Sequence, residues 1–289
     1  MATFKLSVFT DEITNDFGRA LEVAGKEFGL GYVELRAMWG KNIMRLDDKE
    51  IAEARRLLES HRLRVTSIAG PLFKVDWPGA PVSAFSPRDK HGADFTFEQQ
   101  PEVLERGLEL ARVFKTGLLR CFDFWRLEDP KPHRAAMDEQ LRKAAEMAGQ
   151  RGVTLVMENE YACNTATAEE AARTLAAVRL PSFKLNWDPG NAAFRKETPY
   201  PDGYRLLPKG RIGHVHCKDV ERKPDGTPAW MAMGRGLIDY AGHFRALKKD
   251  GYRGAVVLET HWRGAGTPEE STRQSMAGMK ELLRRADAL

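Results

Sequence analysis

The sequence predicts one (β/α)₈ barrel that spans residues 1–289. Three observations favour this fold class. Eight short β-rich runs alternate with longer amphipathic runs, no break in composition divides the chain, and its 289 residues exceed the roughly 250 that such a barrel needs. Strands that alternate with helices pair in parallel, because a parallel neighbour requires a crossover connection.

The expected elements follow one another in order along the chain. The strands are expected at residues 5–10, 32–37, 65–69, 117–122, 154–158, 183–188, 212–216 and 255–259. The helices are expected at residues 16–28, 48–61, 98–114, 134–151, 168–178, 239–249 and 268–288, with a short helical turn near 204–209 in the sixth connection. Capping-box spacings after Asp47 and Thr167, and Thr267 before a proline, mark three helix starts. A doubly wound open sheet is disfavoured, because no Gly-x-Gly-x-x-Gly follows the first strand.

Composition limits the expected partners and the compartment. A formal charge of +4, from basic residues spread over the helices, predicts no nucleic-acid partner. The three cysteines lack CxxC spacing, which argues against a disulfide framework and against a zinc–thiolate site. Since neither a signal peptide nor a run of roughly 18 apolar residues is found, we expect no membrane contact and a cytoplasmic location.

Two connections are unusually long, at residues 72–95 and 220–236. Loops of this length are uncommon unless they are functional or disordered. Both follow strands, so we expect both at the C-terminal rim of the barrel, where barrel enzymes keep their active sites.

Four consecutive late strands end in an acid or a histidine: Glu158, Asp188, His216 and Glu259. Such strand ends converge on the barrel axis, where three carboxylates and an imidazole repel one another unless a cation lies between them. A single acid of this kind is more often a cap or an ion-pair partner, and Asp188 before Pro-Gly can simply start a turn. The set of four nevertheless favours a metal site.

Three carboxylates with one imidazole form a shell that consists mostly of oxygen donors. Such a shell suits Mn²⁺, Mg²⁺ or Co²⁺ better than a structural zinc, which prefers sulfur and nitrogen. We therefore expect one divalent metal ion, with Mn²⁺ as the first choice and Zn²⁺ as a further candidate.

Five segments resemble the sugar phosphate isomerase/epimerase superfamily, whose barrel is shared with xylose isomerase. They are Met-Glu158-Asn, Asp188-Pro-Gly-Asn191, His214-Val-His216-Cys-Lys-Asp219, Gly234-Arg-Gly-Leu-Ile-Asp-Tyr240 and Gly251-Tyr-Arg-Gly-Ala-Val-Val-Leu-Glu259. The resemblance covers essentially the whole chain and is strongest after residue 150. It implies a xylose isomerase-like TIM barrel and the same four ligands. His216 is chosen over His214 because the family's ligand lies three residues before the aspartate, and His214 is expected one layer deeper.

The resemblance also implies isomerisation or epimerisation of a sugar or keto-sugar. The metal would stabilise the enediolate that forms when a proton leaves the carbon next to the carbonyl. Glu158 and Glu259 would be the catalytic residues that take and return this proton. The alternative is a metal-dependent lyase or dehydratase acting on a 3-keto-glycoside or a keto-inositol. An apurinic endonuclease is less expected, because strands two and three end without histidine, and a non-catalytic sugar-binding barrel is the fourth interpretation.

Six residues on or near the rim are candidate substrate contacts: Asn191, Lys218, Arg235, His261, Trp39 and Phe73. For each of them an ordinary rim or packing role is equally expected. Many family members carry histidine where this chain has Glu160, and no phosphate site is evident, so the phosphorylation state of the sugar stays open. The expected partner is a small carbohydrate. A homo-oligomer is compatible with the family, whose members are often dimers or tetramers.

Overall fold

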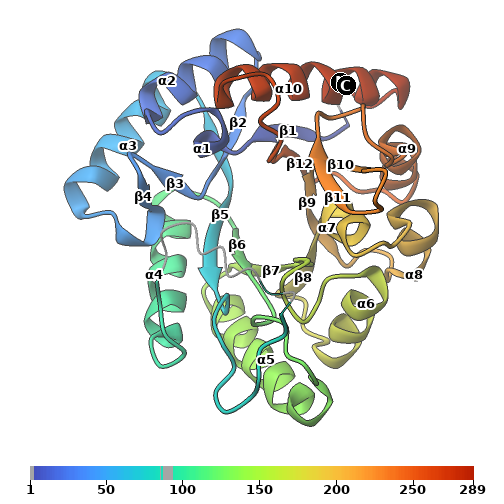
Figure 1. The fold of residues 1–289 in the computed structure, drawn as a ribbon. Helices are drawn as coiled ribbons and strands as arrows, with labels where there is room; N and C mark the ends of the chain where they lie inside the picture. The colour runs from blue at the N-terminus through green and yellow to red at the C-terminus, as the bar shows by residue number, and fades with distance from the viewer. Residues whose placement is uncertain (1–2, 85, 87–93) are drawn as a thin grey trace.

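The main sheet is a ring of eight parallel strands (Figure 1). The computed structural model describes residues 3–84, 86 and 94–289. In chain order the strands of the ring are β1 (Lys5–Val8), β2 (Tyr32–Leu35), β5 (Arg64–Leu72), β6 (Leu118–Cys121), β7 (Thr154–Glu158), β8 (Phe183–Trp187), β9 (Ile212–Cys217) and β12 (Ala255–Leu258). Strands that follow one another in the chain lie side by side in the ring, and each ladder between them is parallel. The predicted (β/α)₈ barrel is therefore confirmed.

The ring closes between its first two strands through one short contact. β1 and β2 share no ladder, but Phe9 and Glu34 form an isolated parallel bridge between them. β1 ends before residue 10, the predicted end of this strand, because the short helix α1 (Thr10–Ile13) begins there. The sheet is therefore a nearly closed barrel, and Glu34 lies at its closing point.

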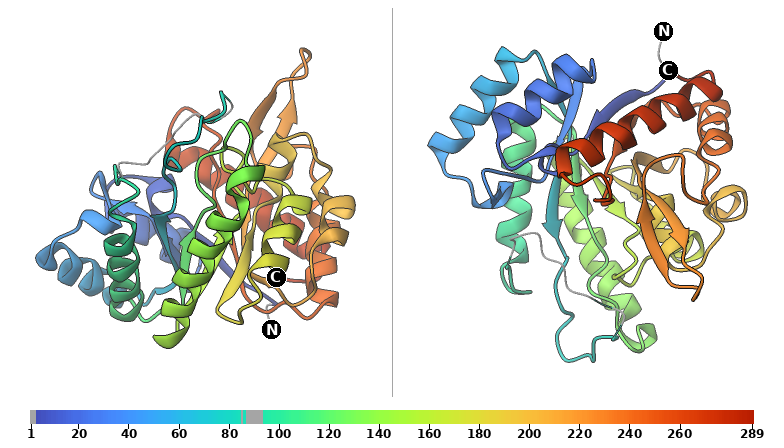
Figure 2. Two further views of the ribbon diagram at one scale, coloured as in Figure 1. Left: turned by 90° about the horizontal axis from the view of Figure 1, so that it is seen from below. Right: turned by 45° about the horizontal axis from the view of Figure 1, so that its top comes forward.

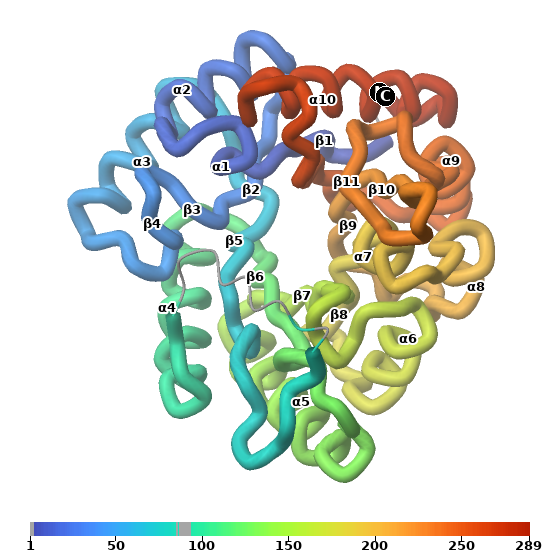
Figure 3. Tube along the Cα trace, viewed as in Figure 1, coloured from blue at the N-terminus to red at the C-terminus, as the bar shows by residue number. Residues whose placement is uncertain are grey.

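Helices cover the outside of the ring (Figure 3). Those at the predicted places are α2 (Phe17–Glu22), α3 (Asp48–Ser60), α4 (Gln100–Val113), α5 (Arg134–Gln150), α6 (Ala168–Ala177), α9 (Tyr240–Lys249) and α10 (Pro268–Arg285). Three short helical turns accompany them: η1 (Val23–Glu27), η2 (Ile43–Arg45) and η3 (Lys131–His133). The predicted helix at 16–28 is shorter as an α-helix, because the π-helix η1 takes its second half. The capping boxes of Asp47 and Thr167 and the cap of Thr267 are confirmed.

Two hairpins lie in connections that follow strands. One pairs β3 (Ala37–Met38) with β4 (Lys41–Asn42), and the other pairs β10 (Asp219–Arg222) with β11 (Pro228–Met231). The long connection at 220–236, expected as a loop, is therefore partly an antiparallel ribbon. This β10–β11 hairpin projects from the end of the barrel opposite to the C-terminus of the chain (Figure 2).

The sixth connection holds more helix than the predicted single turn. Its helical segments are α7 (Pro189–Phe194), η4 (Pro199–Gly203) and α8 (Tyr204–Leu206). They are too short to give a periodic apolar pattern, which explains why the sequence indicated so little here. Part of the long connection at 72–95, namely residues 85 and 87–93, lies outside the described residues.

The barrel buries charged as well as apolar side chains. Most buried apolar residues belong to one cluster that joins strands and helices. Glu34, Arg120 and Glu158 are also buried, although each lies within an otherwise apolar strand. An unpaired buried charge lowers the stability of the fold, so each of these charges needs a partner. The partners of these charges therefore indicate the candidate functional site. Across the residues that the structure describes, no helix has the length and apolar character needed to cross a membrane.

Candidate metal centre

Four polar residues at or near the C-terminal ends of β7, β8, β9 and β12 lie close together. Glu158 is the last residue of β7, Asp188 follows β8, His216 lies in β9, and Glu259 follows β12. One ligand atom from each of the four lies within 4.8 Å of those of the other three. The four side chains are 3% exposed or less. The structure thus brings together the group predicted from the sequence, and its role as a ligand set stays a prediction.

Asp188 has two functions at once, one for each carboxylate oxygen. Its Oδ1 accepts a hydrogen bond from the backbone N–H of Asn191 at 2.9 Å and so caps α7, whose first residue is Pro189. Its Oδ2 has no hydrogen bond among the described residues and makes an ion pair with Lys218 at 2.9 Å. Through Oδ1, Asp188 starts the first turn of α7, as expected. Its Oδ2 faces the cluster instead.

Two arginines from early strands hold the two glutamates of the cluster. Arg120 of β6 donates to Glu158 Oε2 at 2.9 Å, and Arg36, which follows β2, donates to Glu259 Oε1 at 2.7 Å. Each arginine is buried, at 5% and 3% exposed respectively. Since one oxygen of each glutamate is engaged in this way, Glu158 Oε1 and Glu259 Oε2 are the oxygens that face the space shared by the four groups.

Lys218 extends its ammonium group into the same space. Its Nζ lies 2.7 Å from Glu259 Oε2, 2.9 Å from Asp188 Oδ2 and 3.8 Å from Glu158 Oε1. Lys218 passes so close to Gly190 that no larger residue fits at that position. A Cβ added at Gly190 would lie 2.5 Å from both the Cγ and the carbonyl oxygen of Lys218. The glycine of the Asp-Pro-Gly segment is thus explained by the passage of this lysine.

The charges in the cluster shift its pKa values in opposite directions. Burial would raise the pKa of Glu158, but His216 and Arg120 outweigh it and lower that pKa. Burial likewise opposes Lys218 and His261, which together hold the pKa of Glu259 well below its usual range. Burial dominates for Asp188 and raises its pKa to about 7. Although burial alone would lower the pKa of His216, the surrounding carboxylates raise it to about 10.

The donor set fits a divalent cation. Three carboxylates and one imidazole converge, and the buried Asp188 Oδ2 lacks a hydrogen bond among the described residues. Such a cluster of acids requires compensating positive charge, part of which here comes from the ammonium group of Lys218. A divalent ion satisfies the same demand, and these oxygen and nitrogen atoms are donors that Mn²⁺, Mg²⁺, Co²⁺ and Zn²⁺ accept.

Three of the six candidate substrate contacts lie at the cluster. Asn191 donates from Nδ2 to Glu158 Oε1 at 3.1 Å. His261 Nε2 lies 3.1 Å from Glu259 Oε1, and the side chain of His261 is 21% exposed. Like Lys218, these residues contact acids of the cluster.

The described contacts do not bring the other three candidates to the three acids and the histidine. Phe73 is 5% exposed and packs on Phe124 with ring centroids 5.1 Å apart. Trp39 lies in the turn between β3 and β4, where its ring packs on Phe17 at 5.5 Å. Arg235 is exposed in the connection after β11. Phe73 and Trp39 thus make packing contacts of the kind that was expected equally, and a substrate contact for either residue stays a prediction.

Sequence reasoning missed the early-strand charges and an aromatic group beside the site. Trp230 of β11 stacks on Phe194 with centroids 4.6 Å apart, and Tyr161 packs on Phe194 at the same distance. Trp230 also lies 5.2 Å from the ring of His261 and 5.4 Å from Lys218 Nζ. A charged residue between apolar neighbours in Leu-Leu-Arg120-Cys was a usable signal for Arg120, whereas the aromatic group depends on the unexpected hairpin.

Fold and site together define a class of protein: a parallel (β/α)₈ barrel whose late strands gather three carboxylates and a histidine at one end. The family model for the xylose isomerase-like TIM barrel matches residues 23–282. The chain therefore belongs to the xylose isomerase-like TIM barrel family.

Known relatives of this chain include a dehydratase and an epimerase. Inosose dehydratase from Geobacillus thermodenitrificans is 27% identical over 68% of this chain and 70% of its own length. L-ribulose-5-phosphate 3-epimerase UlaE from Escherichia coli is 21% identical, and the match covers 64% of each chain, less than two thirds of that enzyme. A solved structure of the IOLI protein with a bound zinc atom superposes with a TM-score of 0.75 at 16% identity, covering 99% of this chain and 100% of that one. At this identity the superposition shows the shared fold.

Proposed function

We propose that this chain is an enzyme that uses one divalent cation to remove a proton next to the carbonyl group of a carbohydrate. The leading activity is isomerisation or epimerisation of a sugar or keto-sugar. The observation that carries the proposal is the convergence of Glu158, Asp188, His216 and Glu259 within 4.8 Å. Mn²⁺ stays our first choice among the ions that this donor set accepts.

The residues of the chain determine which oxygens can act on a substrate. A bound cation would supply Lewis-acid polarisation of the carbonyl and hydroxyl oxygens of the sugar. Because arginines engage Glu158 Oε2 and Glu259 Oε1, the opposite oxygen of each glutamate faces the substrate. These two oxygens come from the ends of β7 and β12, which flank β8 and β9 in the ring, so one can take a proton from the substrate carbon and the other can return it.

The lowered pKa values of both glutamates set a condition on the substrate. A carboxylate that an arginine and a lysine already stabilise is a weak base. Such a base removes a proton from a carbon only when that carbon is already acidified. A carbon next to a carbonyl meets this condition, whereas an ordinary sugar C–H does not. This argues for a ketose, an aldose in its open form or a keto-inositol.

Polar and aromatic groups next to the acids suit a polyhydroxylated ligand. Asn191 Oδ1 is buried without a hydrogen-bond partner among the described residues. Lys218 and His261 add donors, and Trp230 adds an aromatic face near both of them. Sugars present hydroxyl groups and C–H faces, and these groups would bind them.

Dehydration of a keto-inositol or a similar ketone is the second candidate, favoured by the buried ammonium of Lys218 beside Glu259. The carboxylate would take the proton next to the carbonyl, and the C–O bond on the neighbouring carbon would break. The departing hydroxide would accept a proton from Lys218 and leave as water, so that an unsaturated ketone remains. The match to inosose dehydratase agrees with this chemistry.

One experiment separates these activities. Protein loaded with Mn²⁺ is incubated in D₂O with ketohexoses and, separately, with a keto-inositol, and the products are followed by NMR. Isomerisation or epimerisation incorporates deuterium at the reacting carbon and gives a stereoisomer or an aldose, whereas dehydration gives a conjugated ketone that absorbs in the ultraviolet. Deuterium exchange and product formation that persist in both Glu158→Gln and Glu259→Gln would reject the assignment of these residues.

A matched control accompanies these variants. Asp123 is as deeply buried as the site acids and pairs with Arg134 at 2.6 Å, outside the cluster of four. Asp123→Asn therefore removes a buried carboxylate without removing a predicted metal ligand. We expect its turnover to stay near the unaltered value, measured at a temperature where the variant is folded.

A further inference from the structure

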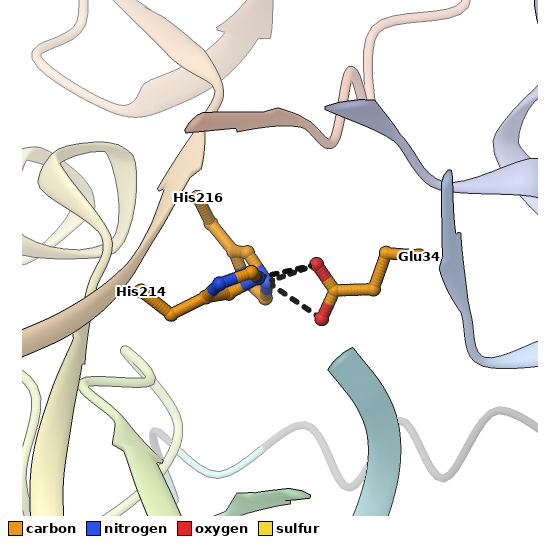
Figure 4. A group of neighbouring side chains, drawn as sticks. All are labelled: Glu34, His214 and His216. Carbon is orange, nitrogen blue, oxygen red and sulfur yellow. Dashed lines mark hydrogen bonds and ion pairs between the residues drawn. The ribbon is translucent and has the colours of Figure 1, made fainter. Parts of the chain in front are cut away.

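Glu34 is a buried acid that the proposed reaction does not use. It lies in β2 at the closing point of the barrel and is 0% exposed. Its ion-pair partners among the described residues are His214 and His216 of β9 (Figure 4). A buried carboxylate without a partner is strongly unfavourable, so the contacts with these two rings are what allow Glu34 to be there.

The ring of His216 lies between two groups of acids, and each of its nitrogens faces a different one. Nε2 lies 3.3 Å from both oxygens of Glu34. Nδ1 lies 3.4 Å from Glu158 Oε1 and 3.6 Å from Glu259 Oε2. The ring of Phe9 packs against that of His216 in a T-shaped contact, with centroids 5.0 Å apart.

The contact with Glu34 decides which nitrogen of His216 can bind a cation. A carboxylate only accepts hydrogen bonds, so His216 must carry a proton on Nε2 to satisfy Glu34. A neutral imidazole has one proton, which leaves the lone pair of Nδ1 directed at the cluster of acids. Asn186 Nδ2 does not make this choice, because it lies 3.1 Å from both ring nitrogens.

His214 is the second histidine that contacts Glu34. Its Nε2 lies 2.6 Å from Glu34 Oε2, a shorter contact than either contact of His216 with this carboxylate. Because Glu34 only accepts, the proton is again on Nε2. His214 was expected one layer deeper than the ligand, and in the structure its ring lies next to that of His216, with centroids 5.4 Å apart.

We propose that Glu34 is a positioning residue of the metal centre: it holds His216 with Nε2 protonated and Nδ1 turned toward the acids, and His214 anchors Glu34 in turn. Carboxylates that orient a ligand histidine in this way typically change metal affinity by about 10- to 100-fold. The proposal rests on the metal site of the proposed function. It assigns Glu34 and His214 to that site, although neither lies at the end of a late strand.

The test is the affinity for Mn²⁺, measured by calorimetry on the purified, chelator-treated full chain and its variants. Glu34→Gln keeps the shape of the side chain but can donate as well as accept, so it no longer fixes the proton on Nε2. We expect its Kd for Mn²⁺ to rise about 10- to 100-fold with one ion bound per chain. The control Asp123→Asn removes another fully buried carboxylate and should leave the Kd unchanged.

A spectroscopic readout separates positioning from a general loss of order. With ¹⁵N-labelled histidine and Zn²⁺ bound, His216 should show a proton on Nε2 and none on Nδ1 in the unaltered protein. In Glu34→Gln the ring should lose this single form. If Glu34→Gln fails to fold, Glu34→Asp keeps the charge but withdraws it by one methylene group, and we expect a smaller rise in Kd.

Each outcome bears on one claim. If the unaltered protein binds no Mn²⁺, the proposed metal site itself fails. If it binds Mn²⁺ and Glu34→Gln binds equally well, or Asp123→Asn weakens binding as much, the role of Glu34 is wrong. Glu34, His214 and His216 also lie within 4.8 Å of one another. Two ions per chain that fall to one in Glu34→Gln would make this trio a second cation site and overturn the proposal.

Discussion

The two halves of the barrel contribute different things to the same site. The late half, from β7 to β12, supplies the proposed donor atoms, which belong to Glu158, Asp188, His216 and Glu259. The early half supplies Glu34, Arg36 and Arg120, which contact His216, Glu259 and Glu158 respectively. The buried acids are tolerable in part because Arg36 and Arg120 of the early half supply compensating positive charge. The late half should therefore control whether an ion binds, and the early half how well.

The largest expected effect is the loss of a late-half donor. Asp188→Asn keeps the cap of α7, because asparagine also caps helices well, but it removes the charge from the oxygen that faces the cluster. We expect Mn²⁺ binding to disappear from calorimetry and turnover to fall by about 10³-fold or more, since metal-based charge stabilisation is worth several kcal/mol. Turnover within tenfold of the unaltered enzyme would contradict the assignment of Asp188.

Breaking an early-half ion pair should affect stability first. In Arg120→Met, Glu158 stays buried without its partner, which costs about 3–5 kcal/mol in comparable pairs. The metal-free variant should therefore melt at a lower temperature than the unaltered protein. Because the uncompensated Glu158 gains more from a cation, Mn²⁺ should raise the Tm of Arg120→Met by more than it raises that of the unaltered chain. Equal shifts in differential scanning calorimetry would show that Arg120 does not act through the cluster.

Lys218 tests whether the ammonium and the ion share the same oxygens. Its Nζ lies 2.7 Å from Glu259 Oε2 and 2.9 Å from Asp188 Oδ2, so it competes with a cation for both. We expect Lys218→Met to bind Mn²⁺ about tenfold more tightly, equivalent to roughly 1.4 kcal/mol, and to turn over substrate poorly. Lys74→Met is the control, because the side chain of Lys74 is only 9% exposed and forms an ion pair with Glu160. An unchanged Kd in Lys218→Met would remove Lys218 from the site.

The last effect does not involve the cluster of acids, and it gives a baseline for pH studies. His243 of α9 is fully buried without a hydrogen bond among the described residues, and burial lowers its pKa to about 3. The unfolded chain has the ordinary histidine pKa of about 6.5 and so binds more protons between these values. Stability should therefore be complete above pH 6.5 and fall below it, by up to about 1.4 kcal/mol per pH unit. Tm measured against pH should fall less steeply in His243→Phe, and parallel curves would contradict this.

The late half could be predicted from the sequence for a simple physical reason. An acid that ends an apolar strand stands out, and repetition of this pattern in β7, β8 and β12 places the acids on one rim. The choice of His216 over His214 came from a resemblance, and the structure shows that the two rings share Glu34. The eight strands were all found because each is a compact β-rich run, and their ends shifted where caps such as Asp188 begin a helix.

The early half could not be predicted in the same way. Glu34 and Arg120 lie inside strands, where alternation makes a polar residue look like a solvent-facing one. Glu34 contacts His216, 182 positions away in the chain, and Arg120 of β6 contacts Glu158 of the neighbouring β7, 38 positions away. No local sequence pattern encodes such pairings. Phe73 and Trp39 pack on Phe124 and Phe17 respectively. A contact of either ring with a substrate stays a prediction.

The central claim is that the ends of the late strands bind one divalent ion. Crystals of the chelator-treated protein soaked in Mn²⁺ test it directly through the anomalous scattering of manganese. We expect one anomalous peak per chain within bonding distance of Glu158, Asp188, Glu259 and His216 Nδ1, and no such peak in Asp188→Asn crystals. An absent peak at full Mn²⁺ saturation, or a single peak held elsewhere on the chain, would contradict it.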